Sequence, residues 1–310
     1  MATASDRTSP APAAGHEGGR ARLVAEVAGR VGSTREATWI VERAEAHPTV
    51  PAGGVRVTAL ALADRRVAGE PLQYVLGSWA FRSLELQVDR RVLIPRPETE
   101  QVVEVALVEL ARAASARDDH AGGDDPMVCV DLGTGSGALA LSLAVEGAGL
   151  RRPLEVWATD ASSDALDVAH ANRDALATTD PAAAARVTFA RGPWFAALPD
   201  RLARRVDLVV SNPPYVGEAE FADLDPTVRD WEPYAALVAP RGRSGVAGLA
   251  DVEAVVAGAG TWLRRHGGLV VELAPSQAYG AIDAARRAGF ARVGTARDLA
   301  GRLRMVVASR

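Results

Sequence analysis

The sequence predicts an α/β protein: a seven-stranded, mostly parallel sheet covered by helices and joined through a β-hairpin to a small N-terminal helical domain. From residue 127 onward, short continuous apolar runs alternate with helical stretches, which is typical of strands buried on both faces of a sheet. The last two apolar runs, 293–296 and 305–308, lie close in sequence and predict an antiparallel hairpin at the sheet edge. Residues 20–69 instead carry apolar side chains at helical spacing.

The N-terminal part divides into a tail and a helical domain. Residues 1–19 are rich in Ala, Gly, Pro, Ser and Thr without periodicity, so we expect a disordered tail. Residues 20–75 form the expected helical domain, with its third helix at Val55–Val67. The apolar residues that indicate its first helix are Leu23, Val24, Val27 and Val31.

Residues 76–97 are expected to link the domains through a β-hairpin. Apolar residues alternate over 81–88, Asp89-Arg90-Arg91 supplies a turn, and 92–94 resume the apolar pattern. Pro95-Arg96-Pro97 would end the hairpin, because proline lacks the N–H that a strand needs.

The main domain is expected over residues 98–310. It begins with a helix at 98–114 and a polar linker at 115–126, and further helices are expected to about 146, from about 163, and at 276–288. The expected strands are residues 127–132, 154–159, 187–190, 206–211, 269–273, 293–296 and 305–308.

Composition excludes several classes of protein. The 310 residues include 35 basic residues, all Arg, and 39 acidic ones, and the net charge of −4 argues against a dedicated nucleic-acid binder. A single cysteine, Cys129, excludes a disulfide framework and a thiolate cluster, and the five His lack metal-ligand spacing, so we expect no metal. No apolar run approaches about 20 residues, and residues 1–19 lack the features of a secretory signal. We therefore expect a cytoplasmic protein with no membrane contact.

A glycine-rich loop follows the first strand of the main domain. Its sequence, Asp131-Leu132-Gly133-Thr134-Gly135-Ser136-Gly137, lets a ligand approach the backbone closely at the carboxyl end of a strand. The second strand ends in Asp160, which can accept two hydrogen bonds from a ribose diol. Together these residues indicate a nucleoside-containing cofactor.

The loop alone does not fix the cofactor. S-adenosylmethionine is the cofactor that we favour, but Gly133, Gly135 and Ala138 also match the fingerprint of dinucleotide-binding proteins. A glycine-rich turn without a ligand, and an Asp160 placed only to favour a helix N-terminus, are the plainer alternatives.

The motif Ser211-Asn212-Pro213-Pro214-Tyr215 follows the fourth strand and indicates the chemistry. Two prolines end the strand and fix the backbone, so that the flanking Asn and Tyr stand on a rigid support. Methylation of an amide or exocyclic nitrogen needs its lone pair aimed at the methyl donor. The Asn212 side-chain carbonyl and the Pro213 backbone carbonyl could accept its two N–H groups, and Tyr215 could stack on the flat target group. An ordinary turn stiffened by two prolines is the alternative.

With these motifs the chain resembles the class I S-adenosylmethionine-dependent methyltransferases, whose sheet is Rossmann-like. Further stretches, at 65–77, 93–100, 232–237 and 297–302, resemble the N5-glutamine methyltransferases of peptide chain release factors. The resemblance covers residues 20–310. It implies methylation of the Gln in the Gly-Gly-Gln motif of class 1 release factors, with residues 20–75 recognising the substrate and the chain acting as a monomer.

The resemblance also implies roles for individual residues. The cofactor would be held by Asp131, Gly133, Thr134, Gly135, Ser136, Gly137, Asp160, Trp194 and Asn212, with Trp194 against the adenine. Asn212, Pro213, Pro214, Tyr215 and Arg96 would bind the substrate, and Asn212, Pro213 and Tyr215 would be catalytic. Three departures from the family pattern are Pro193, where an acid is usual, Ala274, where Gly is usual, and Leu303, where an acid or Asn is usual.

Other activities compete with this interpretation. A glutamine methyltransferase of a ribosomal protein has nearly the same motifs. A DNA adenine-N6 methyltransferase shares Asn-Pro-Pro-Tyr, but about 50 helical residues and a charge of −4 supply neither a target-recognition region nor a basic groove. A nicotinamide-dependent oxidoreductase would explain only the glycine-rich loop. A binding protein without activity is the remaining alternative.

Overall fold

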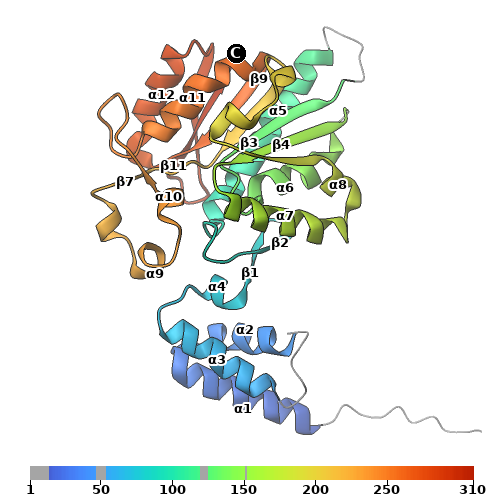
Figure 1. The fold of residues 1–310 in the computed structure, drawn as a ribbon, viewed down its shortest axis with the longest axis vertical. Helices are drawn as coiled ribbons and strands as arrows, with labels where there is room; N and C mark the ends of the chain where they lie inside the picture. The colour runs from blue at the N-terminus through green and yellow to red at the C-terminus, as the bar shows by residue number, and fades with distance from the viewer. Residues whose placement is uncertain (1–13, 47–53, 119–124, 151) are drawn as a thin grey trace, which may run out of the picture. The chain divides into compact units, whose positions relative to one another are not determined.

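The computed structural model describes residues 14–46, 54–118, 125–150 and 152–310. They divide into two compact units, Met1–Leu76 and Gly77–Arg310, which are described separately (Figure 1).

The first unit is helical, with α1 (Ala14–Val31), α2 (Thr34–Glu45), α3 (Val55–Val67) and α4 (Leu72–Leu76). Helix α2 begins at an N-cap, because the Ser33 hydroxyl accepts a hydrogen bond from the Glu36 N–H at 3.3 Å. The core of this unit consists of fully buried side chains of Val27, Ala37, Ile40, Val41, Ala44, Ala59 and Ala63.

The tail expected at 1–19 is wrong for residues 14–19, which belong to helix α1. Once an amphipathic segment has nucleated a helix, each added residue gains a backbone hydrogen bond, so the helix extends into weak helix formers. Residues 1–13 lie outside the described residues.

The second unit opens with a two-stranded hairpin, β1 (Ser78–Phe81) and β2 (Leu84–Gln87), in which Phe81 pairs with Leu84. Its turn lies at residues 82–83, so residues 89–91 do not join its strands. A turn does form at residues 90–91, where the Val92 N–H donates to the Asp89 carbonyl at 3.0 Å, but the strand expected at 92–94 is wrong. Arg82 adopts a left-handed φ of 51°. Its N–H donates to Glu100 at 3.1 Å and its guanidinium to Glu146 at 2.5 Å. These long-range contacts fix the turn and leave no local trace in the apolar pattern.

A seven-stranded sheet forms the centre of this unit, as the sequence predicts. Its order is β10-β11-β9-β6-β3-β4-β5. Neighbouring strands from β9 to β5 pair in parallel, whereas β11 is antiparallel to both of its neighbours, so six strands run in one direction. The strands are β3 (Met127–Leu132), β4 (Leu154–Asp160), β5 (Val187–Arg191), β6 (Val206–Ser211), β9 (Leu263–Glu272), β10 (Arg292–Arg297) and β11 (Leu303–Ser309).

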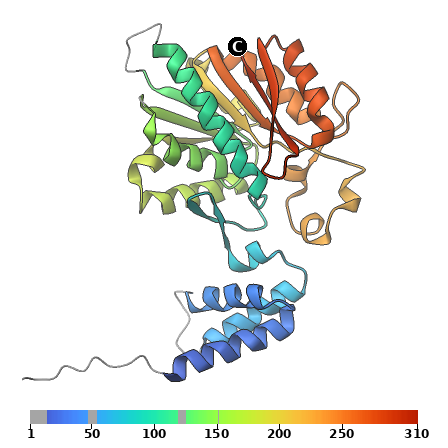
Figure 2. The same ribbon diagram turned by 180° about the vertical axis from the view of Figure 1, so that it is seen from behind.

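Helices cover both faces of the sheet. Helix α5 (Pro97–Asp118), seen running across the sheet in Figure 2, packs in one core cluster with α6 (Ala138–Glu146) and α8 (Pro181–Ala185). Helices α11 (Ala250–Trp262) and α12 (Ala278–Arg287) pack in the second cluster. Helix α7 (Ser163–Ala177) follows β4 and packs on α8 and β5. The chain leaves β5 and returns to β6 on the other side of β3, so the strand order reverses at this point, where open α/β sheets bind ligands.

The segment between β6 and β9 contains elements that the sequence pattern does not predict. They are β7 (Val216–Gly217), β8 (Val238–Ala239), α9 (Pro226–Arg229), α10 (Tyr234–Leu237) and α11. Elsewhere, helix α5 extends four residues beyond its expected end at 114, into the stretch expected to be a linker. Among the described helices, none combines the length and apolar character that crossing a membrane requires.

Candidate active site

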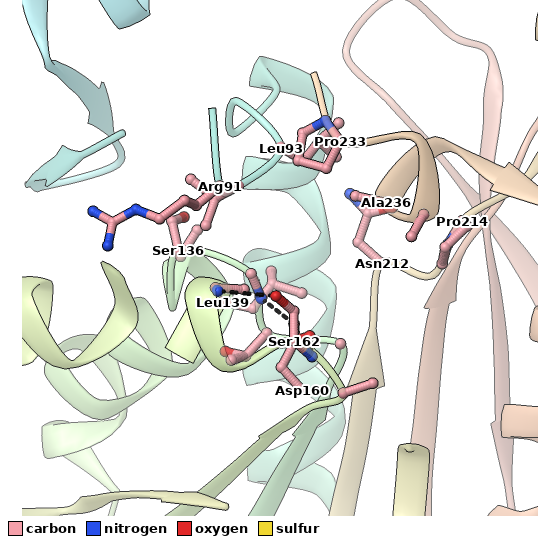
Figure 3. Close-up of a pocket in the computed structure, with 18 of the residues that line it drawn as sticks. Arg91, Leu93, Ser136, Leu139, Asp160, Ser162, Asn212, Pro214, Pro233 and Ala236 are labelled. Atoms are coloured by element: carbon pink, nitrogen blue, oxygen red, sulfur yellow. Dashed lines mark hydrogen bonds between the residues drawn. The ribbon is translucent and has the colours of Figure 1, made fainter. Parts of the chain in front are cut away.

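A cavity of about 510 Å³ opens at the carboxyl ends of β3, β4 and β6 (Figure 3). Asn212 and Pro214 reach it from the segment after β6, whereas Asp160 and Ser162 reach it from the end of β4. The predicted site residues that line it are Gly133, Thr134, Gly135, Ser136, Asp160, Trp194, Asn212 and Pro214. The predicted site residues Asp131, Gly137, Pro213, Tyr215 and Arg96 are not among its lining.

The glycine-rich loop forms one wall of the cavity. The N–H groups of Gly133 and Thr134 both donate to the Thr159 carbonyl, at 2.8 and 3.0 Å, which anchors the loop to β4. Gly133 has a φ of +72°, and a Cβ added there would lie 3.4 Å from the Trp194 ring. Glycine is therefore favoured at 133 by the backbone conformation, whereas an added Cβ would make only an ordinary van der Waals contact with the indole.

Asp160 supports this loop while it faces the cavity. One carboxylate oxygen accepts the Gly135 N–H at 2.9 Å and the other accepts the Ser162 N–H at 2.9 Å. Burial raises the pKa of Asp160. Each carboxylate oxygen has more than one acceptor site, so both can still accept a hydroxyl from a ribose diol.

Asp131 lies beneath the loop and is fully buried. Its Oδ2 accepts hydrogen bonds from the Thr134 hydroxyl at 2.7 Å and the Ala140 N–H at 3.2 Å. Its Oδ1 has no hydrogen-bond partner among the described residues, and burial raises the pKa of Asp131 to about 7. The structure thus gives Asp131 a role in shaping the loop, and the direct cofactor contact stays a prediction.

Gly137 lies at the N-cap of helix α6, with a left-handed φ of 85°. A Cβ added there would lie 3.2 Å from Leu141 and 3.5 Å from Ala169. This glycine permits close packing of α6 and α7 behind the loop.

Trp194 lines the cavity next to Gly133 of the loop. It adopts a left-handed φ of 47°, and its carbonyl accepts a hydrogen bond from the Thr159 hydroxyl at 2.8 Å. A non-glycine residue in this conformation costs about 1–2 kcal/mol. The hydrogen bond from Thr159 thus holds the Trp194 backbone, and the indole, which lines the cavity, offers a flat surface to an aromatic ligand.

Behind Asn212 lies a buried network of hydrogen bonds. The Asn212 Nδ2 donates to the Thr99 Oγ1 at 3.2 Å, and the Thr99 hydroxyl donates to the Glu272 Oε2 at 2.7 Å. The Tyr215 hydroxyl lies 3.5 Å from the Glu272 Oε1 and can donate to it. Glu272 is 1% exposed, and burial raises its pKa to about 7. Tyr215 therefore supports the site from behind, and the structure does not bear out a ring that stacks on the target group.

Arg96 acts at the rim of the cavity. Its Nη2 donates to the Glu232 Oε1 at 2.5 Å, and the Ile94 N–H donates to the Glu232 Oε2 at 3.1 Å. Pro95 and Pro233, the neighbours of this ion pair, both line the cavity. Arg96 thus joins two segments of the rim that lie far apart in sequence.

Asn172 is the other asparagine of the chain, and it is also part of the site's support. Its Nδ2 donates to the Ser136 carbonyl at 2.9 Å and to the Gln87 carbonyl at 3.1 Å, and its Oδ1 accepts the Gln87 N–H at 2.6 Å. The side chain is buried and ties the glycine-rich loop to strand β2.

Comparison with known proteins identifies the family to which this chain belongs. The family model named Methyltransferase small domain matches residues 124–224. A release factor glutamine methyltransferase from Burkholderia pseudomallei is 37% identical over 298 residues, which cover 94% of this chain and 95% of that protein. This chain belongs to the release factor glutamine methyltransferase family.

A second relative agrees with membership of this family. The release factor glutamine methyltransferase of Chlorobaculum tepidum is 42% identical over 209 residues, which cover 67% of this chain and 64%, just under two thirds, of that protein. Among solved structures, the N-terminal domain of human METTL16 in complex with SAH is 14% identical, with a TM-score of 0.48, and the match covers 86% of this chain and 90% of that one.

The cofactor of this methyltransferase is S-adenosylmethionine, and the cavity suits it. Gly133 and Gly135 leave the backbone open to a bound methionine group, Asp160 offers acceptors for ribose hydroxyls, and Trp194 offers a flat wall for adenine. Pro193 also lines the cavity and supplies no side-chain acceptor. In the described part of the chain, no group of three or more His, Cys, Asp or Glu could hold a metal ion.

Thr99, Glu272 and Asn172 support the site, and the sequence did not single them out as site residues. Glu272 is the last residue of strand β9. The carboxyl end of β9 lies beside that of β6, which Asn212 follows, so the position of Glu272 in the sequence could have indicated a site residue. Thr99 lies in the first turn of helix α5, which begins at Pro97, the last residue of the Pro-Arg-Pro segment. The chain has only two Asn, Asn172 and Asn212, and this rarity is a signal in the sequence that could have indicated Asn172.

Proposed function

We propose that this protein transfers a methyl group from S-adenosylmethionine to the side-chain amide nitrogen, N5, of the Gln in the Gly-Gly-Gln motif of a class 1 peptide chain release factor. The observation that carries the proposal is the position of Asn212, which lines the cofactor cavity together with the glycine-rich loop. Its Nδ2 donates to Thr99, and among the hydrogen bonds of the described residues its Oδ1 is left available as an acceptor. Membership of the release factor glutamine methyltransferase family supports the same substrate.

The chemistry requires orientation more than a strong base. When bound, S-adenosylmethionine supplies an electrophilic methyl group on a sulfonium sulfur, which is a good leaving group. The Asn212 Oδ1 would accept one N–H of the target amide, and the Pro213 carbonyl would accept the other. Both contacts fix the plane of the amide and aim the nitrogen at the methyl group, and such positioning can lower a barrier by roughly 7–11 kcal/mol.

In this proposal the helical residues 20–75 recognise the release factor, and the protein acts as a cytoplasmic monomer without direct contact to nucleic acid. Arg96 contributes to substrate binding through the rim that it holds together with Glu232. A ribosomal protein with a reactive Gln is the second candidate substrate, because the motifs of the main domain suit either protein.

A methyl-transfer assay with isotope-labelled S-adenosylmethionine tests this proposal. Recombinant release factor, the same factor with the motif Gln replaced by Ala, and purified ribosomal proteins are each incubated with the enzyme, and their peptides are analysed by mass spectrometry. We expect one added methyl group on the motif Gln and none on the Ala variant. Labelling confined to a ribosomal protein would overturn the release-factor assignment.

A further inference from the structure

The Asn212 amide is held by a chain of hydrogen bonds whose direction is set by the number of available protons. Ionised Glu272 is an acceptor only, and the Thr99 hydroxyl has a single proton, which it donates to the Glu272 Oε2 at 2.7 Å. Towards Asn212, at 3.2 Å, the Thr99 oxygen can therefore only accept. The group that faces it must be the Asn212 NH2, which is a donor.

This direction has a consequence for the cavity. With its NH2 committed to Thr99, the Asn212 side chain cannot rotate by 180° without placing two acceptors against each other. The Oδ1 therefore always faces the ligand as an acceptor. An amide that could flip freely would present its oxygen to the ligand only part of the time.

We propose that Glu272, acting through Thr99, is a positioning residue that fixes the Asn212 side chain with its carbonyl oxygen available to the substrate amide. The expected effect on methyl transfer rests on the proposed function. The expected orientation of the Asn212 side chain rests on the hydrogen bonds alone. Thr99 also lines the cavity, whereas Glu272 is not among its lining residues and acts without touching the substrate.

The surroundings of Glu272 keep the carboxylate in this role. Strand β9 carries it, and it is buried among groups from three other segments: the Thr99 hydroxyl from α5, the Tyr215 hydroxyl from the segment after β6, and the positive charge of Arg304 from β11. Glu98, also on α5, lies 3.6 Å from the Arg304 guanidinium and opposes the ionisation of Glu272.

The network also predicts a response to pH. Protonated Glu272 can donate to Thr99, which frees the Thr99 proton for the Asn212 Oδ1 and removes the preference for one amide orientation. Because the pKa of Glu272 is raised to about 7, we expect the fixed orientation above that pH and its progressive loss below it.

Two substitutions at one position separate orientation from packing. Thr99→Val keeps the shape of the side chain and removes the hydroxyl, whereas Thr99→Ser keeps the hydroxyl. We expect Thr99→Val to lower kcat by roughly 10- to 100-fold with an unchanged Kd for S-adenosylhomocysteine, and Thr99→Ser to stay close to wild type. Glu272→Gln should lower kcat less, because the side-chain carbonyl oxygen of Gln can still accept the hydrogen bond from the Thr99 hydroxyl. Glu272→Gln added to Thr99→Val should cause no further loss, because both act through one path.

A spectroscopic readout tests the orientation without any substrate. The chain has two Asn, so selective 15N-Asn labelling gives two side-chain NH2 signals, which Asn212→Ala assigns. We expect the Asn212 signals to move in Thr99→Val, to stay in Thr99→Ser, and to titrate near pH 7 in wild type but not in Glu272→Gln. Unchanged Asn212 signals in Thr99→Val, or a wild-type kcat in that variant, would overturn the proposal. Wild-type enzyme that fails to methylate release factor would refute the proposed function, while the NMR result would still decide the positioning role.

Discussion

The side-chain amide of Asn172 donates a hydrogen bond to the Ser136 carbonyl at 2.9 Å and so connects helix α7 to the glycine-rich loop. The same side chain makes two hydrogen bonds to the Gln87 backbone, so its removal leaves several buried polar groups without partners. We expect Asn172→Ala to lower the free energy of unfolding by about 2–3 kcal/mol and to weaken S-adenosylhomocysteine binding. Urea denaturation and calorimetric titration measure the two effects. Asn172→Asp, which places a buried acceptor oxygen against the Ser136 and Gln87 carbonyls, should lose at least as much stability. A clearly smaller loss in this variant would contradict the donor role of the amide.

Asp160 should be the carboxylate on which cofactor affinity depends most. Its loss removes the acceptor for the Gly135 and Ser162 N–H groups as well as the proposed ribose contact. We expect Asp160→Ala to weaken S-adenosylhomocysteine binding by at least about 10-fold, equivalent to about 1.4 kcal/mol. Asp164→Ala, on the exposed start of helix α7, is the matched control and should bind normally. The role assigned to Asp160 fails if both variants bind alike in calorimetry.

Because of Asp131, we expect the free energy of unfolding to fall as the pH rises. Burial raises its pKa to about 7, whereas in an unfolded chain an Asp ionises near about 3.9. Between these values the unfolded chain has released its proton and the folded protein still holds it, so rising pH favours unfolding. The stabilising contribution is complete below about pH 4 and is lost by about pH 7, and its size is on the order of a few kcal/mol.

Urea unfolding of wild type and Asp131→Asn from pH 5 to 8 measures this effect. Wild type should lose stability relative to Asp131→Asn as the pH rises towards 7, and the difference should then level off. Comparison with this variant cancels the contribution of Glu272, whose pKa is raised in the same direction. Parallel stability curves would show that Asp131 is ionised in the folded protein throughout this range.

Arg96 should affect the protein substrate more than the cofactor. Its guanidinium neutralises the buried Glu232 and holds Pro95 and Pro233 at the rim, without lining the cavity itself. We expect Arg96→Ala to raise the KM for release factor by about 10-fold, a loss of the size expected for a hydrogen bond to a charged group, with little change in cofactor Kd. Steady-state kinetics also distinguish rim support from direct contact: Glu232→Gln should reproduce the rise in KM, whereas a direct contact of Arg96 would leave that variant normal.

The sequence predicts the sheet well because its signals are local. Strands Met127–Leu132 and Val206–Ser211 lie where the apolar runs place them, since a parallel strand buried on both faces is apolar throughout. The hairpin turn is misplaced because the left-handed Arg82 is stabilised by Glu100 and Glu146, which are distant in sequence.

The site residues also differ in how far the sequence predicts them. The residues whose backbone forms the cavity, Gly133 and Gly135, are evident from the motif. The partners that hold Asn212 are not, because Thr99 is 113 positions from Asn212 and 173 positions from Glu272, and only the folded sheet edge brings them together. For the same reason the motif does not reveal that Tyr215 faces Glu272 and not the cavity.

The central claim is that the Asn212 carbonyl orients the target amide for methyl transfer. It is tested most directly by measuring, for Asn212→Ala, both S-adenosylhomocysteine affinity and the rate of methylation of the Gly-Gly-Gln glutamine of a release factor by mass spectrometry. We expect cofactor affinity close to wild type and a rate lower by at least about 100-fold, in line with the loss of a positioning contact. A variant that binds the cofactor and methylates this glutamine at the wild-type rate would contradict the claim.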